Sequence, residues 1–297
     1  MTPPAGPPGG TAAGVAAALG AYLIWGLVPI FFKWLGHVPA LEIIAHRVVW
    51  SVLLIGGLLA WRGGFDQVAG VAREPRRLAR VALGSAMIMG NWLTFVWAIN
   101  ANRILETSLG YFINPLVSVA LGMAFLGERL RPLQWGALAL AAAGVGNEML
   151  RTGGLPWVSL VLAGSFGVYG LLRKQLAMGT AEGLFLETAL ATPFAAAWLL
   201  WLALAGRGAF VPGDPPTDLL LVLSGPLTAI PLLLFAIGAR RLRLATVGML
   251  QYLAPSMTFV LAILMYGEPM DLTRAASFAV IWAGLALYSI DMLRGRT

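Results

Sequence analysis

The sequence predicts an all-α integral membrane protein whose ten transmembrane helices form two inverted five-helix repeats. Three observations lead to this fold class. Hydrophobic residues make up 59% of the 297 residues and charged residues only 11%, whereas soluble proteins carry about 25% charged residues. The mean hydropathy is +0.81. The chain also repeats itself, because the segment 104–115 is echoed by the segment 244–255.

The two copies of the repeat carry the same landmarks in the same order. A proline, Pro115 or Pro255, closes each repeated segment, and apolar residues then lead to a Gly-Glu pair, at 127–128 or 267–268. Gly26 with Lys33 recurs as Gly167 with Lys174, at an offset of 141. An internal duplication with prolines in matching apolar segments is the usual sequence indication of a transporter whose site lies between its halves.

Ten apolar stretches are separated by charged or Gly/Pro-containing breaks. A transmembrane helix needs about 20 apolar residues, because each residue adds about 1.5 Å toward the roughly 30 Å of the hydrocarbon core. The predicted spans are 14–35, 41–61, 78–99, 105–126, 132–149, 156–173, 182–205, 218–238, 245–266 and 272–292. The longer connections are 62–77 and 206–217. Residues 1–12 are rich in Pro and Gly and are predicted to form a disordered tail.

The distribution of Lys and Arg predicts the orientation. With the N-terminus inside, fourteen of the 20 basic residues lie on the cytoplasmic side, five lie on the other side, and Arg47 lies within a span. Both termini are therefore expected in the cytoplasm. Since five spans per copy is an odd number, residues 13–150 and 151–297 enter the membrane from opposite sides and form inverted repeats. Two such repeats can exchange conformations, which opens one face and closes the other.

Composition excludes several kinds of site. The chain has no cysteine and only two histidines, so thiolate or multi-histidine metal sites are not expected, and no cofactor is predicted. It has no Walker motif, no Gly-x-Ser-x-Gly elbow and no His-Glu-x-x-His, which disfavours ATP hydrolysis and an intramembrane enzyme. The net charge of +7 arises from basic residues in short loops. That pattern is a topology signal rather than a nucleic-acid surface.

Several segments resemble a known family. The segments 20–29 and 37–50 look like the RarD-type branch of the EamA family, in the drug/metabolite transporter superfamily. Residues 114–128 are similar to the fourth helix of that family, and residues 254–268 to its ninth. The similarity covers about residues 14–293.

This resemblance implies a basket of ten helices in the bacterial inner membrane that exports small metabolites such as amino acids. Amino-acid exporters of the YddG type share the architecture. RarD-like members are often named for a link to chloramphenicol, so a multidrug efflux permease is the alternative. An intramembrane enzyme or a channel is a more distant alternative, and the sparse polar residues suit an occluded site better than a channel. The expected partners are a small-molecule substrate and the lipid bilayer. The sequence leaves the oligomeric state open and is compatible with a monomer.

The second predicted span contains three polar residues of interest. Glu42 precedes His46 by four residues, so the two can pair along one helix face. Arg47 is an ionisable residue inside a span, which costs at least about 2.5–3.5 kcal/mol at the bilayer centre. A guanidinium binds a carboxylate bidentately, so Arg47 is a candidate anchor for substrate. The alternative is a structural clamp that pairs with Glu42, Glu106 or backbone carbonyls.

Glu187 occupies the place in the seventh span that corresponds to His46, at an offset of 141. We expect Glu187 and His46 with Arg47 to flank a central cavity from opposite sides. Glu187 is a candidate for gating or for coupling to protons, as are Glu42 and His46. Its alternative role is an ion pair with Arg173 or Lys174. The sequence does not choose between the two.

Prolines inside spans are predicted to break helices, because each removes a backbone hydrogen bond and frees a carbonyl that must find a partner or water. Pro115 and Pro255 have polar neighbours, so substrate is expected there. The alternative is a simple kink. Pro226 and Pro231 are predicted to make the eighth span a flexible gate. The remaining residues predicted to line the cavity are Trp25, Asn91, Trp92, Tyr111, Asn114, Tyr169, Gln251 and Tyr252.

Overall fold

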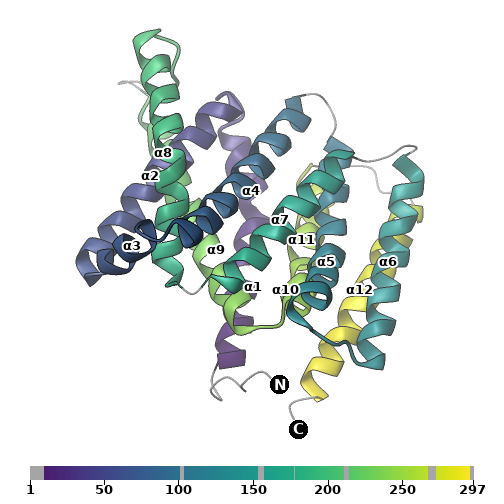
Figure 1. Ribbon diagram of the computed structural model, residues 1–297. Coiled ribbons are helices and arrows are strands. Elements are labelled where there is room, and N and C mark those ends of the chain that lie inside the picture. The colour runs from purple at the N-terminus through teal and green to yellow at the C-terminus, as the bar shows by residue number, and fades with distance from the viewer. Residues whose placement is uncertain are drawn as a thin grey trace.

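The computed structural model describes residues 10–100, 104–152, 157–176, 178–210, 214–266 and 272–294. Within these ranges the chain folds into α-helices joined by short connections (Figure 1). The helices of the first half are α1 (Gly10–Trp34), α2 (Ala40–Arg62), α3 (Phe65–Ala72), α4 (Pro75–Asn100), α5 (Ile104–Leu126) and α6 (Pro132–Thr152). Those of the second half are α7 (Trp157–Gln175), α8 (Thr180–Leu204), α9 (Pro215–Arg241), α10 (Leu244–Gln251), α11 (Leu253–Tyr266) and α12 (Leu272–Arg294).

Each predicted apolar stretch coincides with one helix, except the stretch 245–266, which is divided between α10 and α11 at Tyr252. Among the side chains that the structure describes, those of α1, α2, α8 and α9 form helices long and apolar enough to cross a membrane on their own. That the other helices also cross the membrane stays a prediction.

Three of the predicted helix breaks are wrong. The helix α5 continues through Pro115, and α9 continues through both Pro226 and Pro231. A proline removes only one backbone hydrogen bond, and the neighbouring bonds hold the helix together. The interruption at Tyr252 lies three residues before Pro255. The corresponding region of the first half has no such interruption.

The connection 62–77 contains a short helix that the sequence did not predict. The helix α3 buries Val68 and Val71, which lie three residues apart and therefore on one helix face. Phe65 at its start meets Phe185 of α8 edge to face, with ring centroids 5.4 Å apart. The helix thus covers one end of α8 and α4 without being long enough to cross a membrane.

The helices pack as neighbouring pairs along the molecule. The pair α6 and α12 forms one edge, and the pair α2 and α8 lies toward the opposite edge (Figure 1). Between them, α1 packs on α9 and α5 packs on α7. The start of α1 and the end of α12 lie at the same end of the bundle (Figure 1).

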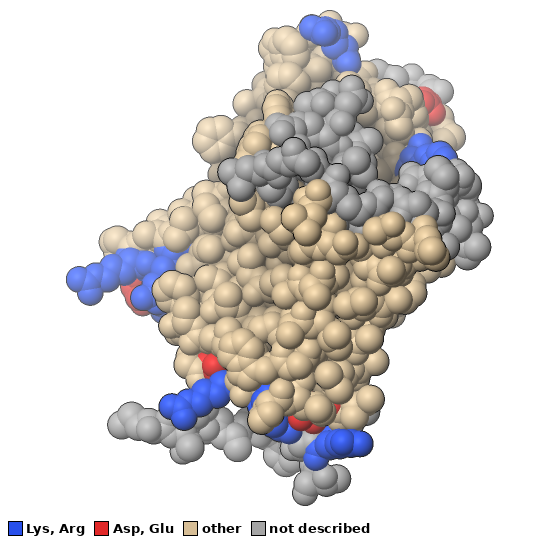
Figure 2. All heavy atoms as spheres, turned by 90° about the vertical axis from the view of Figure 1, so that its right-hand side faces the viewer, with Lys and Arg blue, Asp and Glu red and all other residues tan. Residues whose placement is uncertain are grey.

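The surface is apolar around the middle of the bundle. Figure 2 shows a wide uncharged area on one side, with Lys and Arg gathered toward the margins. Large apolar side chains are strongly exposed, among them Trp61 and Phe194, which are 81% and 80% exposed. Soluble monomers rarely expose apolar patches above a few hundred Å², so this surface is suited to contact with lipid.

Candidate substrate site

Arg47 on α2 lies where four helices meet. Its Nε donates a hydrogen bond of 2.7 Å to Thr228 Oγ1 on α9. The guanidinium carbon lies 4.5 Å from the ring centroid of Trp92 on α4 and 5.2 Å from that of Phe32 on α1. Stacking on an aromatic face stabilises a cation by about 0.5–2 kcal/mol, depending on desolvation. These contacts hold the charge in place without neutralising it.

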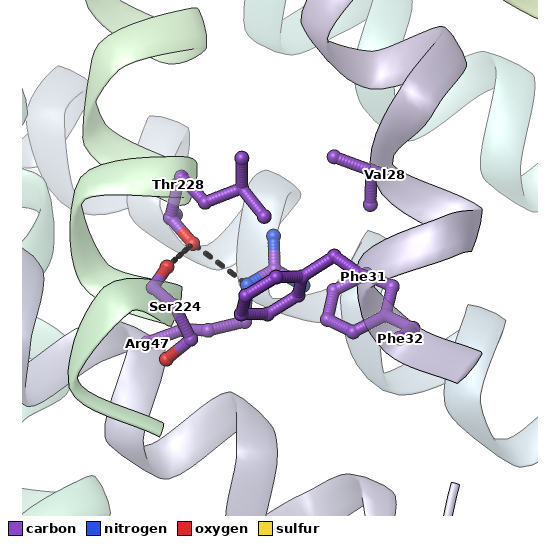
Figure 3. A pocket seen from close by; sticks show the side chains of 7 residues that line it. Val28, Phe31, Phe32, Arg47, Ser224 and Thr228 are labelled. Atoms are coloured by element: carbon purple, nitrogen blue, oxygen red, sulfur yellow. Dashed lines mark hydrogen bonds between the residues drawn. The ribbon is translucent and has the colours of Figure 1, made fainter. Parts of the chain in front are cut away.

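The residues around Arg47 enclose a small pocket between α1, α2 and α9 (Figure 3). Its lining consists of Val28, Phe31, Phe32, Arg47, Ser224, Leu227 and Thr228. The space between these side chains is too small to admit a water molecule, whereas ligand sites measure roughly 300 Å³ or more. Binding a metabolite therefore requires that side chains such as Phe31 and Phe32 move.

No acidic side chain among the described residues pairs with Arg47. The ion pairs found there join Arg77 with Glu74, Arg131 with Asp291, Arg173 with Glu187 and Lys174 with Glu128. The alternative of a clamp between Arg47 and Glu42 is therefore wrong. The side chain of Glu106 lies outside the described part of the structure. A cation among apolar side chains is costly, and one that no described carboxylate neutralises fits a site that receives an anion.

A close approach of α2 and α9 places Arg47 beside Thr228. Ser51, one turn after Arg47, donates a hydrogen bond of 3.0 Å to the carbonyl of Gly225, nearly one turn before Thr228. A Cβ at Gly225 would lie 2.7 Å from the carbonyl carbon of Trp50. Only glycine fits there without displacing a helix.

We therefore expect Gly225→Ala to destabilise the protein by about 1–3 kcal/mol, the usual cost of overpacking. The melting temperature in detergent measures this loss. Gly57→Ala on α2 is the matched control, because a Cβ there meets nothing within 4 Å and alanine favours a helix over glycine by up to about 1 kcal/mol. Equal melting temperatures for the two variants would contradict the close approach.

Glu42 and His46 do not pair as predicted. Instead, Glu42 Oε1 accepts a hydrogen bond of 2.6 Å from the backbone N–H of Ala209. His46 Nδ1 accepts one of 3.2 Å from Trp50 Nε1, and its ring lies 5.2 Å from that of Phe210. The prediction failed because the connection after α8 folds back over α2 and supplies a nearer donor. One oxygen of Glu42 and Nε2 of His46 are buried without a hydrogen bond partner in the described structure.

Glu187 is buried in an ion pair. Its Oε1 lies 3.3 Å from Arg173 Nη1, and its Oε2 accepts a hydrogen bond of 3.1 Å from the Tyr169 hydroxyl. Arg173 and Glu187 side chains are both only 2% exposed. Ser85 on α4 donates to the Glu187 backbone carbonyl at 2.8 Å. The ion pair with Arg173 therefore forms, and a gating role for Glu187 stays a prediction.

The other predicted cavity residues are not among the residues that line the pocket beside Arg47, and a shared cavity stays a prediction. Asn91 links α4 to α7 by donating to the Leu162 carbonyl at 2.9 Å and to Ser165 Oγ at 3.0 Å. Tyr111 is 37% exposed and packs on Phe95. The buried ones are Asn91, Asn114, Gln251, Tyr169 and Tyr252, at 5%, 2%, 5%, 0% and 0% exposed.

Trp25 belongs to an aromatic cluster inside the bundle. Its ring lies 5.6–5.8 Å from the rings of Tyr22, Phe166 and Phe235. Tyr169 stacks on Phe235 in the same cluster. Among the predicted lining residues, Trp92 contacts the Arg47 guanidinium directly in the described part of the chain.

A second polar centre, which sequence analysis did not predict, joins the two halves of the chain. Glu128, just after α5, accepts hydrogen bonds from the backbone N–H groups of Leu244 and Ala245, at 2.6 and 3.0 Å. These are the first residues of α10. A carboxylate there satisfies free N–H groups and complements the positive end of the helix dipole.

Lys174 completes this contact, which we call the clasp and define by Glu128, Lys174, Leu244 and Ala245. Lys174 Nζ lies 3.6 Å from Glu128 Oε1 and also donates to the Leu242 carbonyl. Gly127 has φ of +64°, a left-handed conformation that glycine adopts at little cost, and it turns Glu128 toward α10. The clasp lies at the end of the bundle where α1 begins, since Gly14 packs on Arg241 and Leu242.

A signal for the clasp was present in the sequence. Glu128 belongs to the Gly-Glu pair that the repeat duplicates at 267–268, and Lys174 is the counterpart of Lys33. The duplication marked these residues, but it did not tell which residue each would contact. Residues 267–271 lie outside the described part of the chain.

Comparison with known proteins decides the family. Residues 12–146 match the model of the EamA-like transporter family. An "Uncharacterized transporter" of Vibrio cholerae is 48% identical, over 93% of this chain and 92% of its own length. A "Protein RarD" of Salmonella typhi is 43% identical, over 93% of this chain and 94% of its own.

The chain belongs to the EamA family, in its RarD-like branch. This EamA-family protein is thus a multi-pass bacterial membrane protein and a transporter. A solved crystal structure, 21% identical, matches with a TM-score of 0.72 and covers 95% of this chain and 98% of the solved one. At that identity the likeness concerns the fold alone.

Proposed function

We propose that the protein is a secondary carrier that exports small metabolites bearing a carboxylate, with amino acids as the first class to test. The observation that carries this proposal is Arg47. Its guanidinium lies among apolar and aromatic side chains, faces the pocket of Figure 3, and pairs with no carboxylate of the described residues. Arg47 is therefore assigned the role of substrate anchor.

The proposal includes two inverted repeats of five spans each, residues 13–150 and 151–297. It is supported by helix packing that recurs between corresponding helices. The helix α1 packs on α9 as its counterpart α7 packs on α4, and α5 packs on α7 as α10 and α11 pack on α1. The pairs α2 with α8 and α6 with α12 each join a helix to its own counterpart.

Glycine contacts support the same symmetry. Gly26 lies against Met257, and its counterpart Gly167 lies against Val117; the two partners are 140 residues apart in the sequence. In the pair of α6 with α12, Gly144 approaches Ile281, and Gly284 approaches Ala141. In both cases, a contact between a residue of the first half and one of the second half has a counterpart in which the two halves have changed places.

Alternating access is proposed as the mechanism, with gates at both ends of the bundle. At the end where α1 begins, the clasp joins α5 to α10. Toward the other end, Glu42 accepts a hydrogen bond from the backbone N–H of Ala209, and Phe210 packs on His46. We place the clasp end in the cytoplasm, as the distribution of Lys and Arg predicts. Glu187, paired with Arg173, is assigned a gating role, and transport is expected to be uncoupled or weakly coupled to protons.

Multidrug efflux is the second candidate. The apolar side chains of Val28, Phe31 and Leu227 in the pocket favour an apolar cargo. Because the pocket is closed in this structure, a drug as large as chloramphenicol requires the helices to separate further than a small metabolite does.

Uptake of radiolabelled amino acids and chloramphenicol into liposomes containing the purified protein tests the proposal, with and without a pH gradient. We expect saturable uptake of a carboxylate-bearing metabolite without a gradient. Uptake of chloramphenicol alone would replace the proposal with drug efflux. Uptake that requires the gradient would replace uncoupled with proton-coupled transport.

A further inference from the structure

The contacts of Arg47 determine which part of it a ligand can reach. Nε is engaged with Thr228, and arginine has four further N–H donors on its two terminal nitrogens. Figure 3 shows the guanidinium directed between Thr228 and Phe31. A planar carboxylate can accept two parallel hydrogen bonds from such a group.

The two hydroxyl groups of the pocket already donate hydrogen bonds to backbone carbonyls. Thr228 Oγ1 donates to the Ser224 carbonyl at 2.7 Å, and Ser224 Oγ donates to the Leu221 carbonyl at 2.5 Å. Both bonds stay within α9. The guanidinium is therefore the main donor that the described pocket residues offer to a ligand, and it carries a full positive charge.

The same pocket offers little to a substrate ammonium group. None of its lining residues is acidic. The faces of Trp92 and Phe32, which otherwise attract cations, are already occupied by Arg47. An ammonium bound beside the carboxylate of an amino acid would lie close to the guanidinium, and like charges in a low-dielectric site repel strongly.

Net charge leads to the same conclusion. A zwitterion adds no net charge, so the occupied site keeps the positive charge of Arg47 in apolar surroundings. A monoanion neutralises this charge. A neutral loaded site costs less free energy to close off from water than a charged one, so the change from one open face to the other is easier.

We propose that the substrate is a small monoanion, a carboxylate with an uncharged and largely apolar body such as a 2-oxo acid, and not a zwitterionic amino acid. This inference rests on the proposed transport function. It restricts the proposed substrates from all metabolites that bear a carboxylate to those whose net charge is −1.

The test compares compounds that share one carbon skeleton. The purified full-length protein in liposomes is given radiolabelled 4-methyl-2-oxopentanoate, leucine or leucinol, and the half-saturation concentration of uptake is measured for each. The phenylpyruvate and phenylalanine pair repeats the comparison with a larger body. We expect the 2-oxo acids to have half-saturation concentrations at least tenfold below those of the amino acids. Arg47→Gln should abolish that preference, and Arg62→Gln, at the exposed end of the same helix, should keep it.

Half-saturation of leucine equal to or below that of its 2-oxo acid would overturn the monoanion inference and leave the transport function standing. Equal uptake of leucinol, a cation that lacks the carboxylate, would also overturn it, because the negative charge would then not be recognised. If the folded protein moves none of these compounds, the proposed carboxylate transport itself fails.

Discussion

Replacing Arg47 with glutamine is expected to reduce uptake of carboxylate substrates by about 10- to 100-fold. A hydrogen bond to a charged group contributes about 1.5–3 kcal/mol, and each 1.4 kcal/mol corresponds to about a factor of ten. Glutamine keeps polarity and a donor but loses the charge and the planar pair of N–H groups. Uptake into liposomes measures the loss.

Arg47→Lys separates charge from geometry. It retains the positive charge but cannot reproduce the planar fork that holds Thr228 and a carboxylate together, so an intermediate activity is expected. The control is Arg62→Gln. Arg62 is exposed, and the aromatic ring near its guanidinium in the described structure is that of the neighbouring Trp61. If the folded Arg47→Gln protein takes up substrate as fast as the control, Arg47 has a structural role and does not bind the substrate.

Replacing Glu128 with alanine is expected to weaken the clasp and open the end of the bundle where α1 begins. The variant loses two hydrogen bonds from the carboxylate to the start of α10 and leaves Lys174 without that partner. The side chain of Glu128 is only 7% exposed, so solvent replaces these bonds poorly. We expect the closed state to lose about 2–4 kcal/mol.

Thiol labelling measures this opening, because the protein contains no cysteine of its own. Ser118 on α5 is 5% exposed and lies against Gly248 of α10. In the Ser118→Cys background, Glu128→Ala should raise the rate of maleimide labelling from the clasp side about tenfold or more. Glu74→Ala removes a carboxylate from an exposed ion pair with Arg77, which contributes little, and should leave the rate unchanged. An unchanged rate in the folded Glu128→Ala protein would remove the clasp from the gating mechanism.

The connection between α8 and α9 illustrates a failure of sequence reasoning. Glu42 and His46 are spaced to pair along a helix, and this spacing is a local property. The pairing does not form because Ala209, 167 residues away, supplies a backbone donor to Glu42. No spacing rule describes such a distant donor.

The prolines illustrate a second failure. The sequence marks Pro115 and Pro255 as equivalent, yet α5 is continuous and its counterpart is divided at Tyr252. A proline sets only a preference for a kink. Whether the helix is interrupted depends on the neighbours that can satisfy the freed backbone groups.

The sequence by itself determined the class of protein, the places of the helices, the duplication and the presence of a cation within the second span. These properties depend on hydropathy over about 20 consecutive residues and on residue identity, which are local. The tertiary structure alone decided that Arg47 meets Thr228, that Glu187 meets Arg173 and that Glu128 meets the start of α10. The first and third of these contacts join residues more than 100 positions apart, and all three follow from which helices pack together.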